Sequence, residues 1–187
     1  NKGKIFFENK DIVGLRPCKI CKLGIARTFQ NVRVFSSLTV LDNVKIGVVN
    51  SGKHDKSLNP ADEALKWIDF VGLSSKAYTT VENLTFVDKK LVEIARALAT
   101  RPKLILLDEP LAGLNPTESA QVADMIRRIR DELRISVFWI EHDMKTIMST
   151  CERIIALDYG KKICEGPPHE VSRDKRVVEA YLGEPLA

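Results

Sequence analysis

Short, mostly apolar runs alternate along the chain with segments whose apolar residues recur at helical spacing. The clearest runs are Leu104–Leu107 and Ile135–Ile140, and shorter ones cover 4–7 and 25–29. Runs of this length are typical of strands that are buried on both faces of a parallel sheet. Because these runs alternate with helical segments, the pattern predicts an α/β protein with a mostly parallel sheet flanked by helices.

Helices are predicted where apolar residues form a stripe along one face. A short helix begins at Pro17, and the other predicted helices cover 35–48, 60–71, 86–99, 116–133, 144–151 and 168–182. Residues 47–60 are rich in Gly, Ser, Asn and Lys and are predicted to form a loop. Two strands at 153–157 and 162–165 are predicted to form a hairpin around Asp158-Tyr159-Gly160.

Three of the predicted helices begin with a residue that caps helices well. These starts are Asn59 before Pro60, Thr85 with Asp88 three residues later, and Asn115 before Pro116 with Glu118 at the third position. The second and third starts have the spacing of a capping box, in which two side chains satisfy backbone N–H groups reciprocally.

Composition excludes several classes of protein. With 44% apolar residues and a net charge of +4, the 187-residue chain has the balance of an ordinary globular domain. The arginines of 126–134 are interpreted as a solvated helix face rather than a nucleic-acid surface. No apolar run has the length of a membrane span. Cys18 and Cys21 lack the second pair of ligands that zinc needs, so we expect reduced thiols.

A polar side chain ends each predicted strand of the sheet. Gln30, Asp108 with Glu109, and His142 occupy these positions. Because the carboxyl ends of parallel strands meet at one edge, we expect these groups to converge there. An amide, two carboxylates and an imidazole suit a site for phosphate and Mg²⁺, in which one carboxylate holds the metal and the other accepts a proton from water. Each residue taken alone would be an ordinary loop residue.

These segments resemble the ATP-binding subunit of an ABC transporter over essentially the whole chain. The matching motifs are ILLDEP (Walker B with the catalytic glutamate), ARTFQ (Q-loop), AGLN at 112–115 (D-loop), WIEHDM (switch histidine) and LTFVDKKLVEIARALAT (signature with its helix). GIARTFQNVRVF, LTVLDNV and VVEAYLG are most similar to the branched-chain amino acid importers. The resemblance implies a P-loop NTPase-like α/β core formed by 1–37 and 100–187, with an inserted all-helical signature subdomain at about 38–99.

The resemblance also implies an ATPase with ATP and Mg²⁺ as cofactors, which drives uptake of branched-chain amino acids. The implied catalytic residues are Glu109, His142 and Gln30, the metal ligands are Asp108 and Gln30, and the nucleotide-binding residues are Thr85, Phe86, Val87, Asp88 and Asn115. In this family Glu109 would be the general base, His142 would hold the γ-phosphate, and Asn115 would link the two sites of an ATPase dimer.

The implied partners are a second ABC ATPase subunit, identical or paralogous, and the transmembrane permease subunits. A periplasmic or extracellular solute-binding protein would act indirectly, and no nucleic acid is expected. The subunit would lie peripherally on the cytoplasmic side of the membrane. The segment Asn31–Leu38, with the helical region 40–83, would be the docking surface for the permease.

Two motifs depart from the family pattern. No Walker A motif is present: Gly47–His54 fits G-x4-G-K, but it ends in His54 and lies after Gln30. Since Asn1 is not a methionine and a predicted strand follows at once, we interpret the chain as an N-terminally truncated cassette, inactive by itself. In the signature, Val87 replaces a glycine that allows close approach of nucleotide, and Asp88 adds negative charge.

Two other functions fit parts of the pattern. Soluble ABC-type ATPases that act on DNA or ribosomes have a similar nucleotide site, but they carry a coiled-coil insertion or a second cassette, which this sequence lacks. A non-catalytic remnant would explain the missing Walker A motif. The presence of Glu109 and His142 favours an active parent protein.

Overall fold

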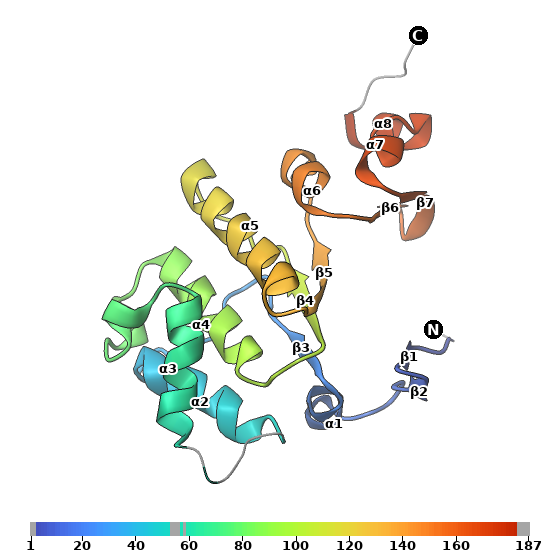
Figure 1. Ribbon diagram of the computed structural model, residues 1–187. Helices are drawn as coiled ribbons and strands as arrows, with labels where there is room; N and C mark the ends of the chain where they lie inside the picture. Colours follow the sequence, from blue (N-terminus) through green and yellow to red (C-terminus); the bar gives the residue numbers. More distant parts are fainter. Residues whose placement is uncertain (1–2, 53–56, 58, 183–187) are drawn as a thin grey trace. The chain divides into compact units, whose positions relative to one another are not determined.

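The computed structural model describes residues 3–52, 57 and 59–182 (Figure 1). The chain forms two compact units, Asn1–Ile140 and Glu141–Ala187, which we describe separately. The proposed division into a core of 1–37 with 100–187 and a helical subdomain of 38–99 is a different partition and stays a prediction.

The first unit contains the predicted parallel sheet. Its strand order is β3 (Ile25–Arg27), β4 (Leu104–Asp108) and β5 (Ser136–Ile140), and both neighbouring pairs are parallel. Ile105 and Leu107 are fully buried, whereas Leu104 and Leu106 on the other face of β4 are half-buried. The α/β prediction is confirmed, but burial of β4 is complete on one face only.

Helices of the first unit follow the predicted stripes closely. They are α1 (Pro17–Leu23), α2 (Val40–Asn50), α3 (Pro60–Phe70), α4 (Phe86–Leu98) and α5 (Pro116–Asp131), with short 3-10 turns η1 (Ser74–Lys76) and η2 (Val81–Asn83). Helices α2, α3 and α4 lie together, and α5 runs beside the sheet (Figure 1). The predicted strand at 4–7 is reduced to β1 (Phe6–Phe7), which pairs with β2 (Lys10–Asp11).

All three predicted helix starts are confirmed. The Asn59 side chain accepts a hydrogen bond from the Ala61 N–H at 3.0 Å. Thr85 Oγ1 accepts from the Asp88 N–H at 3.3 Å. Asn115 and Glu118 form the full capping box, with both bonds at 3.0 Å. Local side-chain chemistry therefore fixes where these helices begin.

Helix α2 includes part of the predicted loop. It begins after the Thr39 cap, rather than at residue 35, and continues to Asn50. Within it Gly47 packs so closely against α4 that a Cβ atom would overlap the Arg96 carbonyl and approach the Ala99 Cβ within 2.9 Å. Gly47 is thus a packing glycine inside a helix, as expected if the G-x4-G-K match is no phosphate loop. Lys53 and His54 of that match lie outside the described residues.

The main hydrophobic core joins the helices to the sheet. It comprises residues from the three clustered helices, from β4 and from α5, among them Val44, Ile68, Val92, Leu98, Ile105, Leu107, Val122 and Ile129. These side chains are at most 2% exposed. Burial of this apolar surface is the main force that holds β4 against its neighbours.

The second unit is built around a hairpin. Helix α6 (Met144–Thr150) precedes the antiparallel strands β6 (Ile154–Asp158) and β7 (Lys161–Gly166), which confirms the predicted hairpin. The predicted helix at 168–182 is instead two helices, α7 (Pro168–Val171) and α8 (Lys175–Leu182). The break arises because the Asp174 carboxylate accepts the Arg176 N–H at 2.9 Å, which is a helix-starting bond.

None of the helices among residues 3–52 and 59–182 combines the length and the apolar character that a membrane span requires.

Candidate functional site

Two of the predicted site residues meet where β3 and β4 end. The Gln30 side-chain amide donates a hydrogen bond from Nε2 to Glu109 Oε2 at 2.8 Å. Gln30 is exposed and Glu109 is half-buried, so the contact lies at the surface of the first unit. The sheet register produces the contact, because parallel pairing of β3 with β4 carries both strand ends to one edge.

Asp108, the other carboxylate at this edge, has a cationic partner. Arg27 Nη2 lies 2.9 Å from Asp108 Oδ2, and the two side chains are 55% and 28% exposed. Arg27 ends β3 and pairs in register with Leu106, so it lies one strand over from the carboxylate. Sequence reasoning missed this partner, although a lone basic residue at the end of an apolar strand was a usable signal.

The backbone at Glu109 is unusual for a residue with a side chain. Its φ angle is +44°, in the left-handed region that disfavours residues other than glycine. The Glu109 N–H donates to the Ile140 carbonyl at 2.9 Å, and the buried Lys90 Nζ lies 3.4 Å from the Glu109 carbonyl oxygen. Such strain is retained where the surrounding contacts over-determine it, and it is common at functional sites.

Asn115 is at the amino terminus of α5, where its side-chain oxygen accepts the Glu118 N–H. The residue is exposed. The cap uses the carbonyl oxygen of the side chain, while the side-chain amide nitrogen bonds to no other residue of the part of the chain that the structure describes. A role across a dimer is compatible with this geometry and stays a prediction.

His142 belongs to the second unit, directly before α6. Its side chain is 74% exposed, and Nδ1 lies 3.6 Å from the buried carboxylate of Glu141. The following residue, Asp143, caps α6 by accepting the Lys145 N–H at 3.1 Å. His142 is thus presented at the surface between a strand end and a helix start, and its γ-phosphate role stays a prediction.

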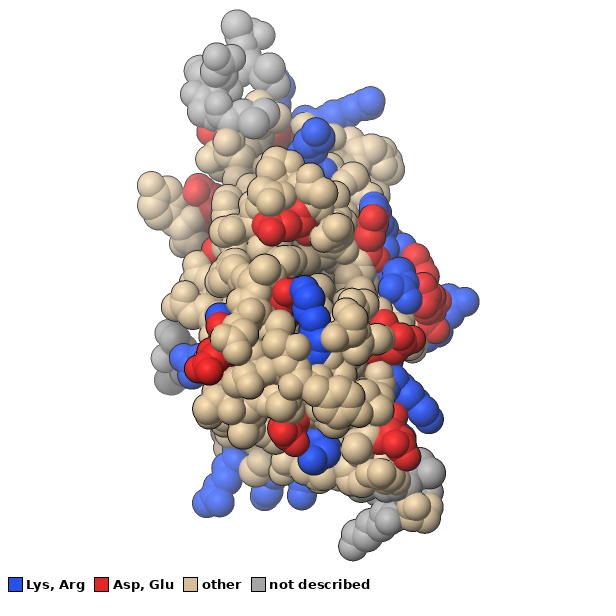
Figure 2. Space-filling model, turned by 90° about the vertical axis from the view of Figure 1, so that its left-hand side faces the viewer, with Lys and Arg blue, Asp and Glu red and all other residues tan. Residues whose placement is uncertain are grey.

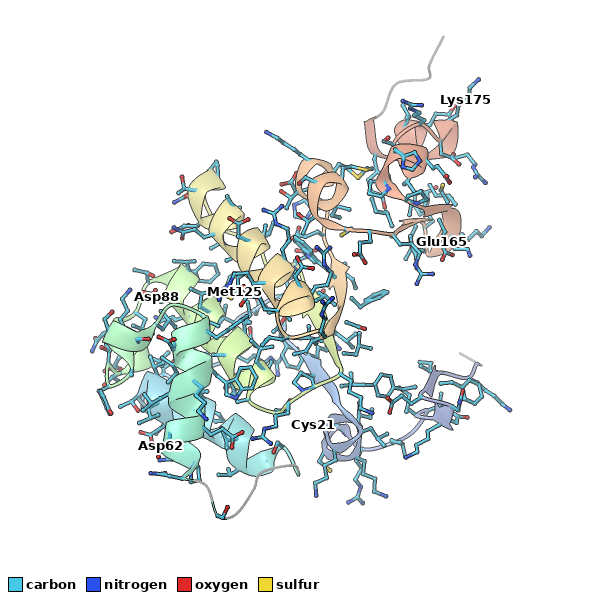
Figure 3. The ribbon with its side chains drawn as sticks, viewed as in Figure 1. Cys21, Asp62, Asp88, Met125, Glu165 and Lys175 are labelled. Atoms are coloured by element: carbon cyan, nitrogen blue, oxygen red, sulfur yellow. The ribbon has the colours of Figure 1, made fainter. Side chains whose placement is uncertain are left out.

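The signature residues are the N-cap and first turn of α4, where Figure 3 labels Asp88. Asp88 is buried. Lys76 Nζ lies 2.6 Å from Asp88 Oδ2. Burial acts to raise the pKa of Asp88, but hydrogen bonds from Lys76 and Thr85 outweigh it and hold the pKa below its usual range. The negative charge expected of Asp88 is therefore paired inside the helical cluster.

Phe86 and Val87 point in different directions from the same turn. Phe86 is 48% exposed, and its ring centroid lies 5.2 Å from Lys90 Nζ. The same ring packs against the turn at Gly113, in the predicted D-loop. Val87 is half-buried and packs against the main core. The valine that replaces a family glycine is therefore at least partly a core residue.

The strand-end residues suit Mg²⁺ only in combination with other ligands. Among the described residues, no three His, Cys, Asp or Glu side chains are grouped to hold a metal ion by themselves. Mg²⁺ usually takes one or two carboxylates and completes its shell with water and substrate phosphate. The Asp108 carboxylate and the Gln30 amide oxygen fit that pattern, and Mg²⁺ would compete with Arg27 for the Asp108 carboxylate.

In the view of Figure 2, lysine and arginine side chains are interspersed with aspartate and glutamate, and the described residues form no large patch of a single sign there. This mixture is typical of a solvated surface rather than of a phosphate-backbone footprint.

Comparisons with known proteins agree with this fold and with these motifs. The family model described as "ABC transporter" matches residues 1–112, and one described as "Branched-chain amino acid ATP-binding cassette transporter" matches residues 161–187. The first match covers more than half of the chain. The chain therefore belongs to the ABC transporter family, whose ATP-binding proteins couple ATP hydrolysis to transport.

Within that family the chain most resembles branched-chain amino acid transport ATP-binding proteins. It is 33% identical to LivG of Salmonella typhimurium and 34% identical to BraF of Pseudomonas aeruginosa; each alignment covers 97% of this chain and 76% of the relative. The solved ADP conformation of MJ1267, an ATP-binding cassette of an ABC transporter, has a TM-score of 0.83 at 31% identity, covering 98% of this chain and 78% of that one.

Proposed function

We propose that this chain is the larger part of an ATP-binding subunit that drives import of branched-chain amino acids. The observation that carries the proposal is the Gln30–Glu109 hydrogen bond beside Asp108, at the end of two parallel strands. Support for the solute class comes from the relatives, which are named as branched-chain amino acid transport proteins, and from the match at 161–187.

The proposed chemistry divides the strand-end residues by role. Asp108 and Gln30 would hold Mg²⁺, which when bound neutralises phosphate charge. Glu109 would accept the proton of the attacking water, for which its half-buried carboxylate at a strand end is suited. Gln30 already donates to that carboxylate, so it is close enough to orient the same water.

The remaining predicted site residues would act on nucleotide from other directions. His142 would contact the γ-phosphate, and its high exposure leaves the ring accessible. Thr85–Asp88 at the start of α4 would face nucleotide held by a second ATPase subunit, since a helix amino terminus favours anions. Asn115 would link the two sites. In this proposal 38–99 is the helical signature subdomain.

Docking of the permease would use the segment Asn31–Leu38. Beside it is a shallow groove lined by Arg33, Val34, Phe35, Ile46 and Arg96. Phe35 is 50% exposed and its ring lies beside the Arg96 guanidinium, so an apolar anchor is available next to a cation. The assembly would lie on the cytoplasmic side of the membrane, and a solute-binding protein outside it would deliver the amino acid.

Uptake in the source organism tests this function directly. We expect Asp108→Asn, introduced at the chromosomal gene, to reduce ATP-dependent uptake of labelled leucine by at least about 100-fold, because even loss of a residue that only orients a metal ligand costs about 10–100-fold. Asp124→Asn, an exposed carboxylate paired with Arg127 on α5, is the matched control and should leave uptake unchanged. Normal leucine uptake with loss of another solute would overturn the solute class, and normal uptake of all solutes would overturn the transport role.

The 187-residue chain by itself is proposed to have no ATPase activity. Phosphate contacts from a G-x4-G-K-[ST] loop supply much of the binding in this class, and these residues contain no such motif. Calorimetry with Mg-ATP checks the proposal, and tight binding would contradict it.

A further inference from the structure

The segment that follows Gln30 has no helix or strand of its own. Residues 31–39 connect the strand-end site to the start of α2, and Arg33 and Phe35 in the first part of this connection are exposed. A segment of this kind would normally be mobile, because no ladder of backbone hydrogen bonds fixes it. Its backbone is instead held by side chains from two helices.

Glu93 of α4 holds the backbone three residues after Gln30. Its carboxylate, in a residue only 4% exposed, accepts the Arg33 N–H at 3.2 Å. Burial raises the pKa of Glu93, and the Arg33 N–H and the charges of Arg96 and Lys90 offset this only in part. A buried carboxylate is costly unless such donors satisfy it.

Arg96, one turn further along α4, binds the same segment through a backbone carbonyl group. Its Nη2 donates to the Arg33 carbonyl oxygen. Its guanidinium also lies over the Phe35 ring, 5.5 Å from the centroid. Glu93 and Arg96 together therefore bind the N–H and the C=O of one residue, Arg33.

Asn43 of α2 holds the end of the segment in the same way. It is fully buried; its Oδ1 accepts the Phe35 N–H at 2.9 Å, and its Nδ2 donates to the Phe35 carbonyl at 3.0 Å and to the Thr39 carbonyl at 2.9 Å. Arg33 and Phe35 are thus each bound through both backbone polar groups.

We infer that Glu93, Arg96 and Asn43 are positioning residues for Gln30: by fixing the backbone at Arg33 and Phe35 they set where the Gln30 amide lies against Glu109. None of the three touches Gln30 or Glu109 through a side-chain bond in the described contacts, so the effect passes through the backbone. Apolar side chains would fill the same space at lower desolvation cost, which favours a role in holding this backbone geometry. The inference rests on the proposed roles of Gln30 and Glu109.

Hydrogen exchange and NMR of the chain without nucleotide test the inference independently of ATPase activity. In Glu93→Met, which keeps the length of the side chain but removes the acceptors, we expect the Arg33 amide to exchange at least about tenfold faster, as for loss of a hydrogen bond to a charged group. The Gln30 side-chain amide should lose its hydrogen-bonded chemical shift. Glu93→Gln retains an acceptor oxygen, so its Arg33 amide should exchange within about threefold of the wild-type rate. The Gln30 side-chain amide of this variant should keep its hydrogen-bonded chemical shift.

Glu63→Met is the matched control. Glu63 is a similarly buried glutamate, 5% exposed. Its ion pair is with Arg101 and not with the segment after Gln30. This variant should lower stability and leave the Gln30 amide signal unchanged. If Glu93→Met does not fold, Arg96→Lys, which removes the fork that reaches the Arg33 carbonyl, should shift the same Gln30 signal. An unchanged Gln30 signal in a folded variant with fast Arg33 exchange would overturn the inference, whatever the ATPase assays give.

Discussion

The strand-end site and the signature turn use their motif residues in opposite ways. At the strand ends, Gln30 and Glu109 bond to each other at the surface, and Asp108 pairs with an arginine that is 55% exposed. In the signature turn, Asp88 is buried against Lys76 and Val87 packs against the core. The strand-end site has its polar groups at the solvent-accessible surface, whereas the signature turn buries Asp88 and packs Val87 against the core.

This difference explains in physical terms why Val87 and Asp88 depart from the family pattern. Val87 and Asp88 replace residues that would face nucleotide, and both have gained contacts within the helical cluster. Thr85 and Phe86 remain exposed on the same turn. The signature turn thus has two exposed residues and two that pack within the first unit. The polar side chains of the strand-end site are more solvated, so we expect the fold to depend little on them.

The largest effect is expected from Glu109→Gln in the complete subunit. Removing the proposed general base should reduce ATP turnover by about 10²–10⁴-fold, because the amide cannot accept the proton. ATP should stay bound, since the phosphate contacts are elsewhere. Turnover and nucleotide retention are measured on the same preparation, and near-normal hydrolysis would remove Glu109 from that role.

Val87→Gly tests whether the signature valine is structural. We expect a loss of about 1–2 kcal/mol in the free energy of unfolding, because half-buried apolar contacts disappear. Urea unfolding measures it, with Val49→Gly, at a 52% exposed position of α2, as the control for glycine in a helix. A rise in ATP turnover with unchanged stability would show instead that Val87 obstructs approach of nucleotide.

Asp88→Asn should remove a pH dependence. Because the pKa of Asp88 is lowered in the folded chain, its contribution to stability is present above the unfolded pKa of about 3.9 and is lost as pH falls through the folded pKa. The variant should lose about 1 kcal/mol at neutral pH, a modest value because Lys76 is 43% exposed, and should show a flatter acid limb.

Unfolding curves at pH 7 and at successively lower pH measure this change. Asp62→Asn, an exposed acid in the first turn of α3, is the matched control for helix position. Equal acid limbs in Asp88→Asn and wild type would mean that the charge of Asp88 is not held by Lys76.

The smallest effect is expected from Arg27→Gln at the strand ends. The pair with Asp108 is largely solvated, so stability should fall by less than about 1 kcal/mol. The urea midpoint checks this value. A loss of twice that size would contradict the view that the strand-end polar groups are dispensable for folding.

Sequence reasoning found the elements and the strand-end site because both depend on local signals. The caps at Asn59, Thr85 and Asn115 bond within three residues, and a parallel register brings strand ends together whatever surrounds them. It failed at the start of α2, at its extension beyond residue 48 to Asn50, and at the break between α7 and α8. At those places tertiary packing or one side-chain bond decided the result.

The sequence by itself determined the α/β class, the alternation of helices and strands along the chain, the mostly parallel sheet and the family. It could do so because periodicity, caps and motifs are local. Only the tertiary structure decided which charges are paired: Asp108 with Arg27, Asp88 with Lys76, and Glu93 with the backbone beside Gln30. These partners are 81, 12 and 60 residues apart for Arg27–Asp108, Lys76–Asp88 and Arg33–Glu93. Packing brings them together, and no local pattern specifies a contact over such separations.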